Sequence, residues 1–485
     1  MSQSTATHLQ LQVSTSPTQI QVQPDVYPFA AYLAQRFQCT HVISIGEPTA
    51  EDLIQLHPQF KIIGIVPSSV LNFYRNEFPF ETWLERNLDD SDEILLDEDT
   101  LKRATMVCAN VIDRLADPAR LIRRVKDWLD RAPVCVFTCA DRDLNRGNGD
   151  QVCSNSHPGW NLEEFKCLLE DEGLNVEFIG WTADDNVRYE KKTIATVITR
   201  NRTGKLARAS APSDFKVVGF MAAYNEEDLI VQSIRKWTDQ GIHVHILENW
   251  STDATYDLAK HLESSLPLTV ERFPEEGPSR YFDWGAILER IEGLSREIKA
   301  DWFVRRGVDE VLMSPWPRVS YRDGLYLVDQ AGFNCVDHTV IQFHPVDDGF
   351  EVGSDHESYF KHFVFPKDRA YFIQRKAWKN YGRAISSLPS GGHEVNFEGS
   401  RVYPFKFLLK HYPVRSQKHG EKKVFRERKA RWNPDERAKG WHVHYDTVEE
   451  GHRFLHPAAE REVFDEDHFD KTYLMERLSG VGIIR

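Results

Sequence analysis

Short apolar runs alternate with amphipathic segments along the first part of the chain. Runs of strand length lie at residues 41–46, 61–66, 105–110, 133–139, 175–181 and 191–199. Apolar residues recur at helical spacing within residues 29–37, 51–57, 118–131 and 162–172. Strands that alternate with helices predict a doubly wound α/β domain. The last two strands have no helix between them and predict an added antiparallel hairpin.

A second series begins with a strand at 217–221, a helix over 229–237 and a strand at 244–247. This βαβ pattern favours a parallel sheet, in which ligands bind at the carboxyl ends of the strands. No glycine-rich phosphate loop follows either strand, so neither a dinucleotide fingerprint nor a P-loop is predicted. Polar side chains follow both strands at this edge, namely Asn225, Glu226, Glu248 and Asn249.

Later segments extend the second series. Helical spacing resumes from Trp284 to Ile291, and strands are predicted at 301–315, 324–329 and 338–345. A basic helix is predicted over 421–431, with Glu427 and Arg431 paired across one turn.

Composition shifts divide the chain. Residues 1–24 are rich in Ser, Thr and Gln and predict a disordered tail, followed by a first domain over 25–200. Residues 201–214 lack apolar rhythm and predict a linker to a second domain over 215–446. The C-terminal extension, 447–485, contains one apolar stretch at 473–478, which we expect to be a docking helix.

Charge and cysteine usage exclude several classes of protein. The 485 residues carry a formal net charge of −14, which argues against a nucleic-acid partner. Seven cysteines without a CxxC pair indicate neither a disulfide framework nor a zinc site. No apolar run approaches the roughly 20 residues of a transmembrane segment, and no leader opens the chain. We therefore expect a soluble, cytoplasmic protein.

The segments AAYNEE (222–227) and ENWSTDAT (248–255) resemble the opening motifs of family 2 glycosyltransferases, which have the GT-A fold. The resemblance implies a GT-A domain with a mixed sheet that binds a nucleoside-diphosphate sugar. It implies nucleoside-pocket residues at Ala223, Tyr224, Asn225 and Glu226, with Glu248 and Asn249 opposite. Glu248 stands where the family usually has Asp.

Two later motifs extend this resemblance. WFVRRGVDE (302–310) looks like the family segment in which an Asp-x-Asp holds Mg²⁺ or Mn²⁺, but Gly307 replaces the first Asp. Either Asp309 with Glu310 carries the cation, or Arg305 or Arg306 neutralises part of the charge. His411, in KHYPVRS, matches a histidine metal ligand of relatives. Arg415 and His419 lie in a basic stretch of an otherwise acidic chain, which indicates an anionic diphosphate partner.

Inverting sugar transfer also needs a base that takes the proton of the acceptor hydroxyl. The loop SGGHEV (390–395) places His393 and Glu394 beside a double glycine. Glu394 is the first candidate for the base and Asp355 the second, and spacing alone does not separate them.

The first domain is similar to class I S-adenosylmethionine-dependent methyltransferases over about residues 28–200, in VISIG, NVIDRLADP and WNLEEF. It departs from them where the cofactor binds. Ser44, Gly46, Pro48 and Ala50 replace the Asp-x-Gly-x-Gly-x-Gly loop, and Pro48 removes a backbone donor. Val66 stands in place of the ribose-binding acid. We therefore expect a degenerate domain that does not bind S-adenosylmethionine.

Together these patterns predict an α/β protein with a Rossmann-like methyltransferase-type domain followed by a GT-A glycosyltransferase domain. The predicted activity transfers a sugar from a nucleoside-diphosphate sugar to a hydroxyl of a glycan or other acceptor, helped by a divalent cation. Two alternatives remain open, a bifunctional methyltransferase and glycosyltransferase, and a glycan-binding pseudoenzyme.

Overall fold

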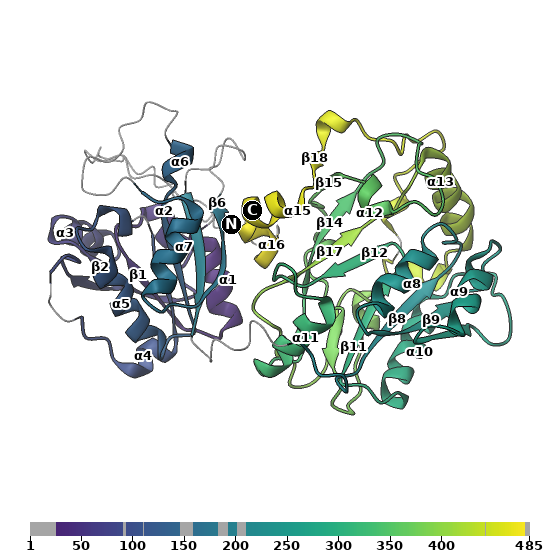
Figure 1. Ribbon diagram of the computed structural model, residues 1–485, viewed down its shortest axis with the longest axis horizontal. Helices are drawn as coiled ribbons and strands as arrows, with labels where there is room; N and C mark the ends of the chain where they lie inside the picture. The colour runs from purple at the N-terminus through teal and green to yellow at the C-terminus, as the bar shows by residue number, and fades with distance from the viewer. Residues whose placement is uncertain are drawn as a thin grey trace, which may run out of the picture.

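The computed structural model describes residues 26–90, 94–109, 111–145, 159–182, 193–200, 210–441 and 443–480. The predicted tail at 1–24 and most of the predicted linker at 201–214 lie outside these ranges. Two α/β parts lie side by side, and the C-terminal helices sit between them (Figure 1).

The first part is built on a seven-stranded sheet of order β3-β2-β1-β4-β5-β7-β6. β7 runs antiparallel to both β5 and β6, whereas the other pairs are parallel. This order confirms the doubly wound sheet with its antiparallel hairpin. The elements are α1 (Val26–Arg36), β1 (His41–Ile45), α2 (Ala50–Ile54), β2 (Lys61–Val66), α3 (Ser68–Glu77), β3 (Thr82–Glu85), α4 (Glu98–Lys102), β4 (Ala104–Cys108), η1 (Ile112–Arg114), α5 (Pro118–Leu129), β5 (Val134–Ala140), α6 (Arg142–Asn145), α7 (Leu162–Asp171), β6 (Val176–Thr182) and β7 (Thr193–Thr199).

Local signals in the sequence explain where these helices begin. Asn161 caps α7 in a reciprocal capping box with Glu164, and Pro118 occupies the first turn of α5. The strands β1, β2, β4 and β5 are almost wholly buried, because helices cover both faces of the sheet.

The second part contains two mixed sheets. A six-stranded sheet has the order β10-β9-β8-β11-β16-β13, and a five-stranded sheet has the order β12-β17-β14-β15-β18. The strands are β8 (Val217–Ala223), β9 (His243–Glu248), β10 (Leu268–Arg272), β11 (Trp302–Gly307), β12 (Glu310–Met313), β13 (Cys335–Val336), β14 (His338–Phe343), β15 (His362–Val364), β16 (Ala377–Lys379), β17 (Phe407–His411) and β18 (Glu462–Val463). The helices are α8 (Ile230–Thr238), α9 (Thr255–Glu263), α10 (Trp284–Glu297), α11 (Tyr321–Gln330), α12 (His356–Tyr359), η3 (Arg369–Tyr371), η4 (Leu388–Ser390), α13 (Gln417–Glu421), η5 (Lys422–Arg428), η6 (Lys429–Arg431), α14 (Pro434–Ala438), η7 (Val443–Tyr445), η8 (Ala458–Glu460), α15 (Glu466–Thr472) and α16 (Leu474–Ser479).

The strand predicted at 324–329 is wrong, because this segment lies within the helix α11. Ser320 caps the helix by accepting from the backbone N–H of Asp323, and Tyr321, Leu325 and Val328 are buried at helical spacing. The short apolar run carried too little periodicity to separate a strand from a buried helix. The predicted basic helix also differs, since it divides into α13, the π-helical η5 and the 3-10 turn η6.

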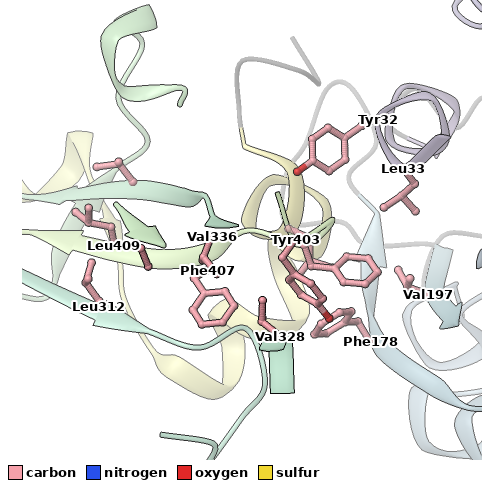
Figure 2. Packing of buried hydrophobic residues seen from close by; sticks show 14 of the residues in the cluster. Tyr32, Leu33, Phe178, Val197, Leu312, Val328, Val336, Tyr403, Phe407 and Leu409 are labelled. Atoms are coloured by element: carbon pink, nitrogen blue, oxygen red, sulfur yellow. The ribbon is translucent and has the colours of Figure 1, made fainter. Parts of the chain in front are cut away.

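A shared hydrophobic core joins the two parts. Phe178 of β6 packs 4.9 Å, centroid to centroid, from Phe405, in the cluster that Figure 2 shows around Tyr403 and Phe407. The C-terminal extension contributes to this junction: β18 adds a strand to the five-stranded sheet, and α15 and α16 pack against β6. The expected docking helix at 473–478 is therefore confirmed as α16. A side chain at Gly180 would lie only 2.5 Å from the carbonyl oxygen of Lys471, so β6 and α15 approach closely.

Candidate functional site

A pocket of about 580 Å³ opens where β8 and β11 end, and we call it the main pocket. The two strands are parallel neighbours in which Ala222 pairs with Gly307, so the loops that follow them meet at one edge of the sheet. Aromatic residues form much of the lining: Tyr224, Phe282, Trp284, Tyr371, Trp432, Trp441 and Tyr445. The charged residues and histidines of the lining are Glu226, Arg305, Asp309, Glu310, Asp368, Lys376, His393, His411, Lys423, Arg428 and Lys439.

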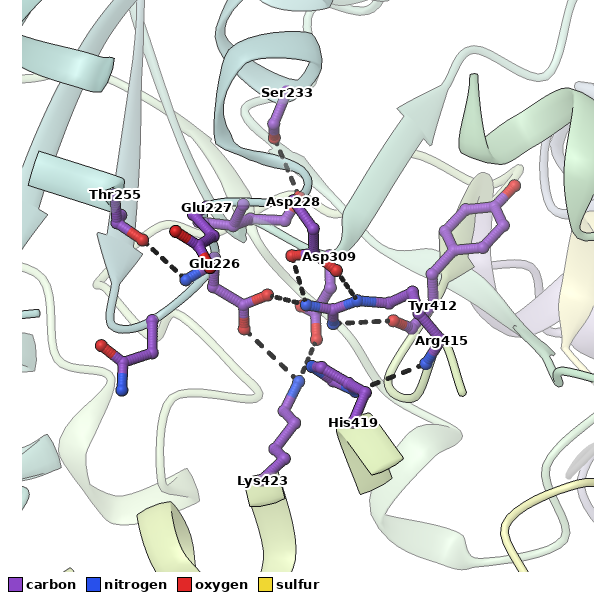
Figure 3. A network of polar contacts seen from close by, with 12 residues as sticks. Glu226, Glu227, Asp228, Ser233, Thr255, Asp309, Tyr412, Arg415, His419 and Lys423 are labelled. Carbon is purple, nitrogen blue, oxygen red and sulfur yellow. Dashed lines mark hydrogen bonds and ion pairs between the residues drawn. The ribbon is translucent and has the colours of Figure 1, made fainter. Parts of the chain in front are cut away.

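A chain of alternating charges forms part of this lining and extends behind it, and Figure 3 shows its centre. Arg415 holds Asp228 through two hydrogen bonds of 2.9 Å, and it also donates to Glu226. Lys423 lies between Glu226, at 3.4 Å, and Asp309, at 2.9 Å. We call Glu226, Asp228, Asp309, Arg415, Lys423 and His411 the Asp309 network, since His411 Nε2 lies 3.7 Å from Asp309 Oδ2.

Electrostatics keep Asp309 ionised and Lys423 charged. Burial raises the pKa of Asp309, but Lys423 and His411 outweigh it and hold that pKa well below its usual range. Burial lowers the pKa of Lys423, and the carboxylates Asp309 and Glu226 more than compensate, so its pKa is raised. The pocket therefore presents an ionised carboxylate and a charged lysine at the same place.

Glu310 also lines the main pocket but belongs to a different pair. Its Oε1 pairs with the buried Lys376, and its Oε2 accepts a hydrogen bond of 2.8 Å from the backbone N–H of Gly307. Burial raises the pKa of Glu310, and Lys376 together with His411 overcomes this and lowers it to about 2. A side chain at position 307 would begin 2.7 Å from Asp309 Oδ1, so the glycine makes room for this placement of Asp309.

The predicted metal ligands are therefore only partly assembled. Asp309 and His411 lie together, whereas Glu310 turns to Lys376. Within the ranges that the structure describes, no group of three or more His, Cys, Asp or Glu side chains is placed to hold a metal ion. The carboxylate of Asp309 still suits Mg²⁺ or Mn²⁺, since Mg²⁺ often takes only one or two protein carboxylates together with phosphate oxygens and water.

Some of the residues expected to bind the nucleoside line the main pocket, and the others lie behind its lining. Ala223, Tyr224 and Glu226 line the main pocket. Asn225 adopts a positive φ of 55° and ties its loop to Thr252 and Glu427. Glu427 pairs with Lys422 at 3.1 Å in place of the predicted pair with Arg431.

Glu248 and Asn249, at the end of β9, are buried and bonded within the protein. Glu248 accepts from the backbone N–H of Ser251 and pairs with Arg272 at 3.4 Å. Asn249 accepts from Arg431, whose guanidinium also stacks 4.0 Å from the ring centroid of Tyr224. These two residues therefore shape the wall behind Tyr224 rather than the pocket surface.

Arg415 and His419 likewise lie behind the lining. The guanidinium of Arg415 is 1% exposed and is neutralised by Glu226 and Asp228. Burial and the neighbouring Arg415 and Lys423 hold the pKa of His419 well below its usual range. The positive charge of the basic stretch around Arg415 and His419 is thus largely neutralised by carboxylates of the same chain. The sequence pattern alone did not predict this neutralisation.

Neither predicted base lines the main pocket. Glu394 pairs with Arg375 at 3.3 Å, and Asp355 caps α12 on the surface, where it pairs with Lys236 at 3.5 Å. The neighbour of Glu394, His393, does line the pocket, and its Nδ1 accepts a hydrogen bond of 2.8 Å from Gln374. Because that amide nitrogen also donates to the carbonyl of Ala370, the neutral ring of His393 carries its proton on Nε2.

Sequence reasoning missed Asp368 and Lys376. Both lie in the stretch 361–380, whose aromatic and basic residues masked them, and no motif marks either one. Asp368 caps the turn η3 and accepts from the backbone N–H of Ala370 at 2.9 Å. Lys376 becomes significant only through its contact with Glu310.

In the first part, the loop after β1 is held by contacts within the protein. The backbone N–H of Gly46 donates to Ile65, and the Pro48 carbonyl accepts 2.6 Å from the hydroxyl of Tyr74. The Tyr74 ring stacks 4.6 Å from that of Trp83, and Val66, where the family has its ribose-binding acid, is fully buried. The backbone and side chains of this loop are thus engaged with the protein itself.

Comparisons with known proteins leave the family open. No protein-family model matches the chain, and no curated protein matches it. Among solved structures, a SAM-dependent methyltransferase from Aquifex aeolicus is 14% identical, with a TM-score of 0.26, over 33% of this chain and 82% of its own. The methyltransferase domain of bacterial CtHen1 is 16% identical, with a TM-score of 0.29, over 36% of this chain and 97% of its own.

The [4+2]-cyclase SpnF is 10% identical, with a TM-score of 0.28, over 38% of this chain and 83% of its own. At these scores, the fold of the first part rests on its own strand order and not on the likeness.

No helix in the described ranges has the length and apolar character needed to cross a bilayer.

Proposed function

We propose that the protein transfers a sugar, with inversion, from a nucleoside-diphosphate sugar to a hydroxyl of a glycan or other acceptor. The observation that carries the proposal is the shared position of Asp309, Lys423 and His411 in an aromatic-lined pocket at the ends of β8 and β11. The GT-A motifs AAYNEE and WFVRRGVDE supply the residues at that edge.

The charges of the Asp309 network suit a departing diphosphate. Lys423 is a cation in the lining of the pocket, and Arg415 holds Glu226 and Asp228 in place behind it. A divalent cation held by Asp309 and His411 would offset the charge that grows on the leaving diphosphate. Lys423 would then be drawn from Asp309 toward the diphosphate oxygens.

The proton of the acceptor must pass to a base while the new bond forms. Of the four lining carboxylates, Glu226, Asp309 and Glu310 are ion-paired within the described chain, whereas Asp368 stands exposed at the rim. We assign the base to Asp368. Its carboxylate takes the proton as the acceptor oxygen bonds to the anomeric carbon, and the bond from that carbon to the diphosphate breaks with its electron pair.

Asp368 and the sequence-based candidate Glu394 are separated by matched variants. Asp368→Asn should lower the rate of sugar transfer by about 10²-fold or more, whereas Glu394→Gln should leave it within about threefold. The reverse result would return the role to Glu394. Circular dichroism of both variants checks that each is folded.

The donor class is tested by a thermal-shift panel of UDP, GDP, ADP, CDP and dTDP, each with and without Mn²⁺. Selective binding to the folded state raises the melting temperature, so one diphosphate should stabilise the protein more than the others. No shift with any diphosphate would refute the proposal.

Two observations favour a glycan-binding protein without transfer as the second candidate. Gly307 replaces the first acid of the motif, and Lys423 already neutralises Asp309. This candidate predicts that glycans bind but that no nucleoside diphosphate is released from any donor sugar.

A further inference from the structure

Arg305 is a buried cation, and the protein leaves two nitrogens of its guanidinium group without a hydrogen bond. It lies on β11, is 6% exposed and lines the main pocket. Among the described residues, neither Nε nor Nη2 has a hydrogen-bond partner. Its neighbour Arg306 differs, because it donates to Ser233 and to the Glu310 carbonyl on the other face of the strand.

The surroundings of Arg305 fix its guanidinium in the wall of the main pocket. The ring of Trp284 lies beneath it, 5.5 Å from the guanidinium carbon, and donates 2.7 Å to the carbonyl of Gly391. Gly391 and Gly392 both have positive φ, and a side chain at Gly392 would begin only 3.0 Å from Nη1 of Arg305. Gly392 therefore allows this loop to approach Arg305 closely, and its positive φ favours glycine at this position.

The charges around Arg305 specify the kind of group it would receive. Glu310 is nearby, but Lys376 and the Gly307 N–H already hold its two carboxylate oxygens. Arg305, Lys376 and Glu310 together carry one net positive charge. Burial lowers the pKa of Arg305 to about 10, so it stays charged at neutral pH. One further carboxylate would balance the cluster, and a guanidinium fork matches its two oxygens.

We infer that Arg305 binds the carboxylate of a sugar acid, so that a uronic-acid-type sugar is a substrate of this pocket. The identification of the ligand as a sugar rests on the proposed function. The inferred contact is separate from the Asp309 network, which faces the diphosphate in that proposal. The carboxylate belongs either to the sugar of the donor or to the acceptor.

The test compares methyl β-D-glucuronide with methyl β-D-glucoside, which differ at C6 by a carboxylate and a hydroxymethyl group. Dissociation constants are measured by ligand-observed NMR with the full chain. We expect the glucuronide to bind at least tenfold more tightly than the glucoside. In Arg305→Met this preference should fall to less than twofold, and Arg305→Lys, which keeps the charge but loses the fork, should be intermediate.

Arg428→Met is the matched control, because Arg428 also lines the pocket and lies 5.1 Å from the ring centroid of Phe282. In this variant the ratio of the dissociation constants of the two glycosides should stay the same, even if both constants change. Equal binding of the two glycosides by the unaltered protein, or binding of neither, would overturn the inference even if Arg305→Met failed to fold. A ratio that falls equally in both variants would also overturn it.

The same probes distinguish the two sources of the carboxylate. An intact nucleoside-diphosphate hexose should displace the glucuronide if the site takes the sugar of the donor, and should leave it bound if the site takes the acceptor. A glucuronide preference without any diphosphate binding would refute the proposed function alone. Diphosphate binding and release without a glucuronide preference would refute this inference alone.

Discussion

The edges that follow the parallel strands differ between the two parts of the molecule. In the first part, Tyr74 and Trp83 stack beside the loop after β1, and Tyr74 holds the Pro48 carbonyl. In the second part, the equivalent edge opens into the main pocket, with Asp309 and Lys423 at its base. Similar α/β layers thus carry different groups where their strands end, because the loops and their side chains decide what the edge can bind.

The two parts also differ in what they bury. A large cluster of the first part is apolar, formed by residues such as Ile43, Met106 and Phe137. The second part buries ion pairs and imidazoles beside its pocket, including Arg415 and His338. Burying charge is costly unless each group is paired, so the second part should be the more sensitive to single substitutions and to acid.

The largest effect is expected for Arg415→Met. Loss of the guanidinium leaves the carboxylates of Glu226 and Asp228 buried with less compensation, so the free energy of unfolding should fall by about 3–5 kcal/mol. Urea unfolding at pH 7 measures it. Arg235→Met is the control, because Arg235 is exposed, and it should change stability by no more than about 0.5 kcal/mol. Similar losses in the two variants would contradict the network.

Asp309→Asn tests whether the open edge is the reactive one. The amide keeps the shape but removes the charge that orients Lys423 and His411, so release of nucleoside diphosphate should fall by about 10²-fold or more. Asp355→Asn should retain full activity, because Asp355 lies on the surface outside the main pocket. Loss of activity in the Asp355 variant would instead support the second sequence-based candidate.

Acid should destabilise the second part through its buried imidazoles. Burial lowers the pKa of His338 to about 4 despite its hydrogen bond to the Gln374 carbonyl. In the unfolded chain the same imidazole takes up a proton near pH 6.5. The stability that the folded protein gains at this site is therefore fully present above pH 6.5 and is lost as the pH falls toward 4. The loss is about 3 kcal/mol for this group. Urea unfolding at pH 7, 5.5 and 4.5 measures this loss. In His338→Gln the free energy of unfolding should depend less steeply on pH.

One feature is shared by the seven-stranded and the six-stranded sheet and should respond equally in both. Gly64 lies under the ring of Trp83, and Gly219 under that of Trp237, where an added Cβ would lie 2.0 and 1.5 Å from the ring atoms. Gly64→Ala and Gly219→Ala should each cost about 1–3 kcal/mol by overpacking.

Gly293→Ala is the control for this pair, since it lies within α10 and the nearest atom is 3.8 Å from the added Cβ. It should stabilise the helix by about 0.5–1 kcal/mol. A neutral result for either strand glycine would mean that its tryptophan ring can shift.

The smallest effect is expected for S-adenosylmethionine. Because the loop after β1 is bonded within the protein, calorimetric titration of the full chain with S-adenosylmethionine should show no binding heat. The nucleoside diphosphate that gives the largest thermal shift serves as the positive control. Saturable binding of S-adenosylmethionine would make the two edges alike and revive the bifunctional alternative.

Much of this architecture follows from local patterns in the sequence. The spacing of apolar residues and the capping residues predicted β1, β2, α5 and α7 correctly. The βαβ unit at 217–248 also lies where the spacing predicts it. The strand predicted at 324–329 was wrong because an apolar run of six residues does not distinguish a strand from a buried helix. Asp309, Glu226 and His411 were predicted on motif grounds, and they do meet in one pocket.

The sequence by itself determined the alternation of elements, the polar ends of β8 and β11, and the proline in the loop after β1. Only the tertiary structure decided which charge faces which. It paired Arg415 with Asp228, turned Glu310 to Lys376 and, among the described residues, left Nε and Nη2 of Arg305 without a hydrogen-bond partner. These pairs join residues that are 66 to 187 positions apart, and periodicity within a segment carries no information about such distant contacts.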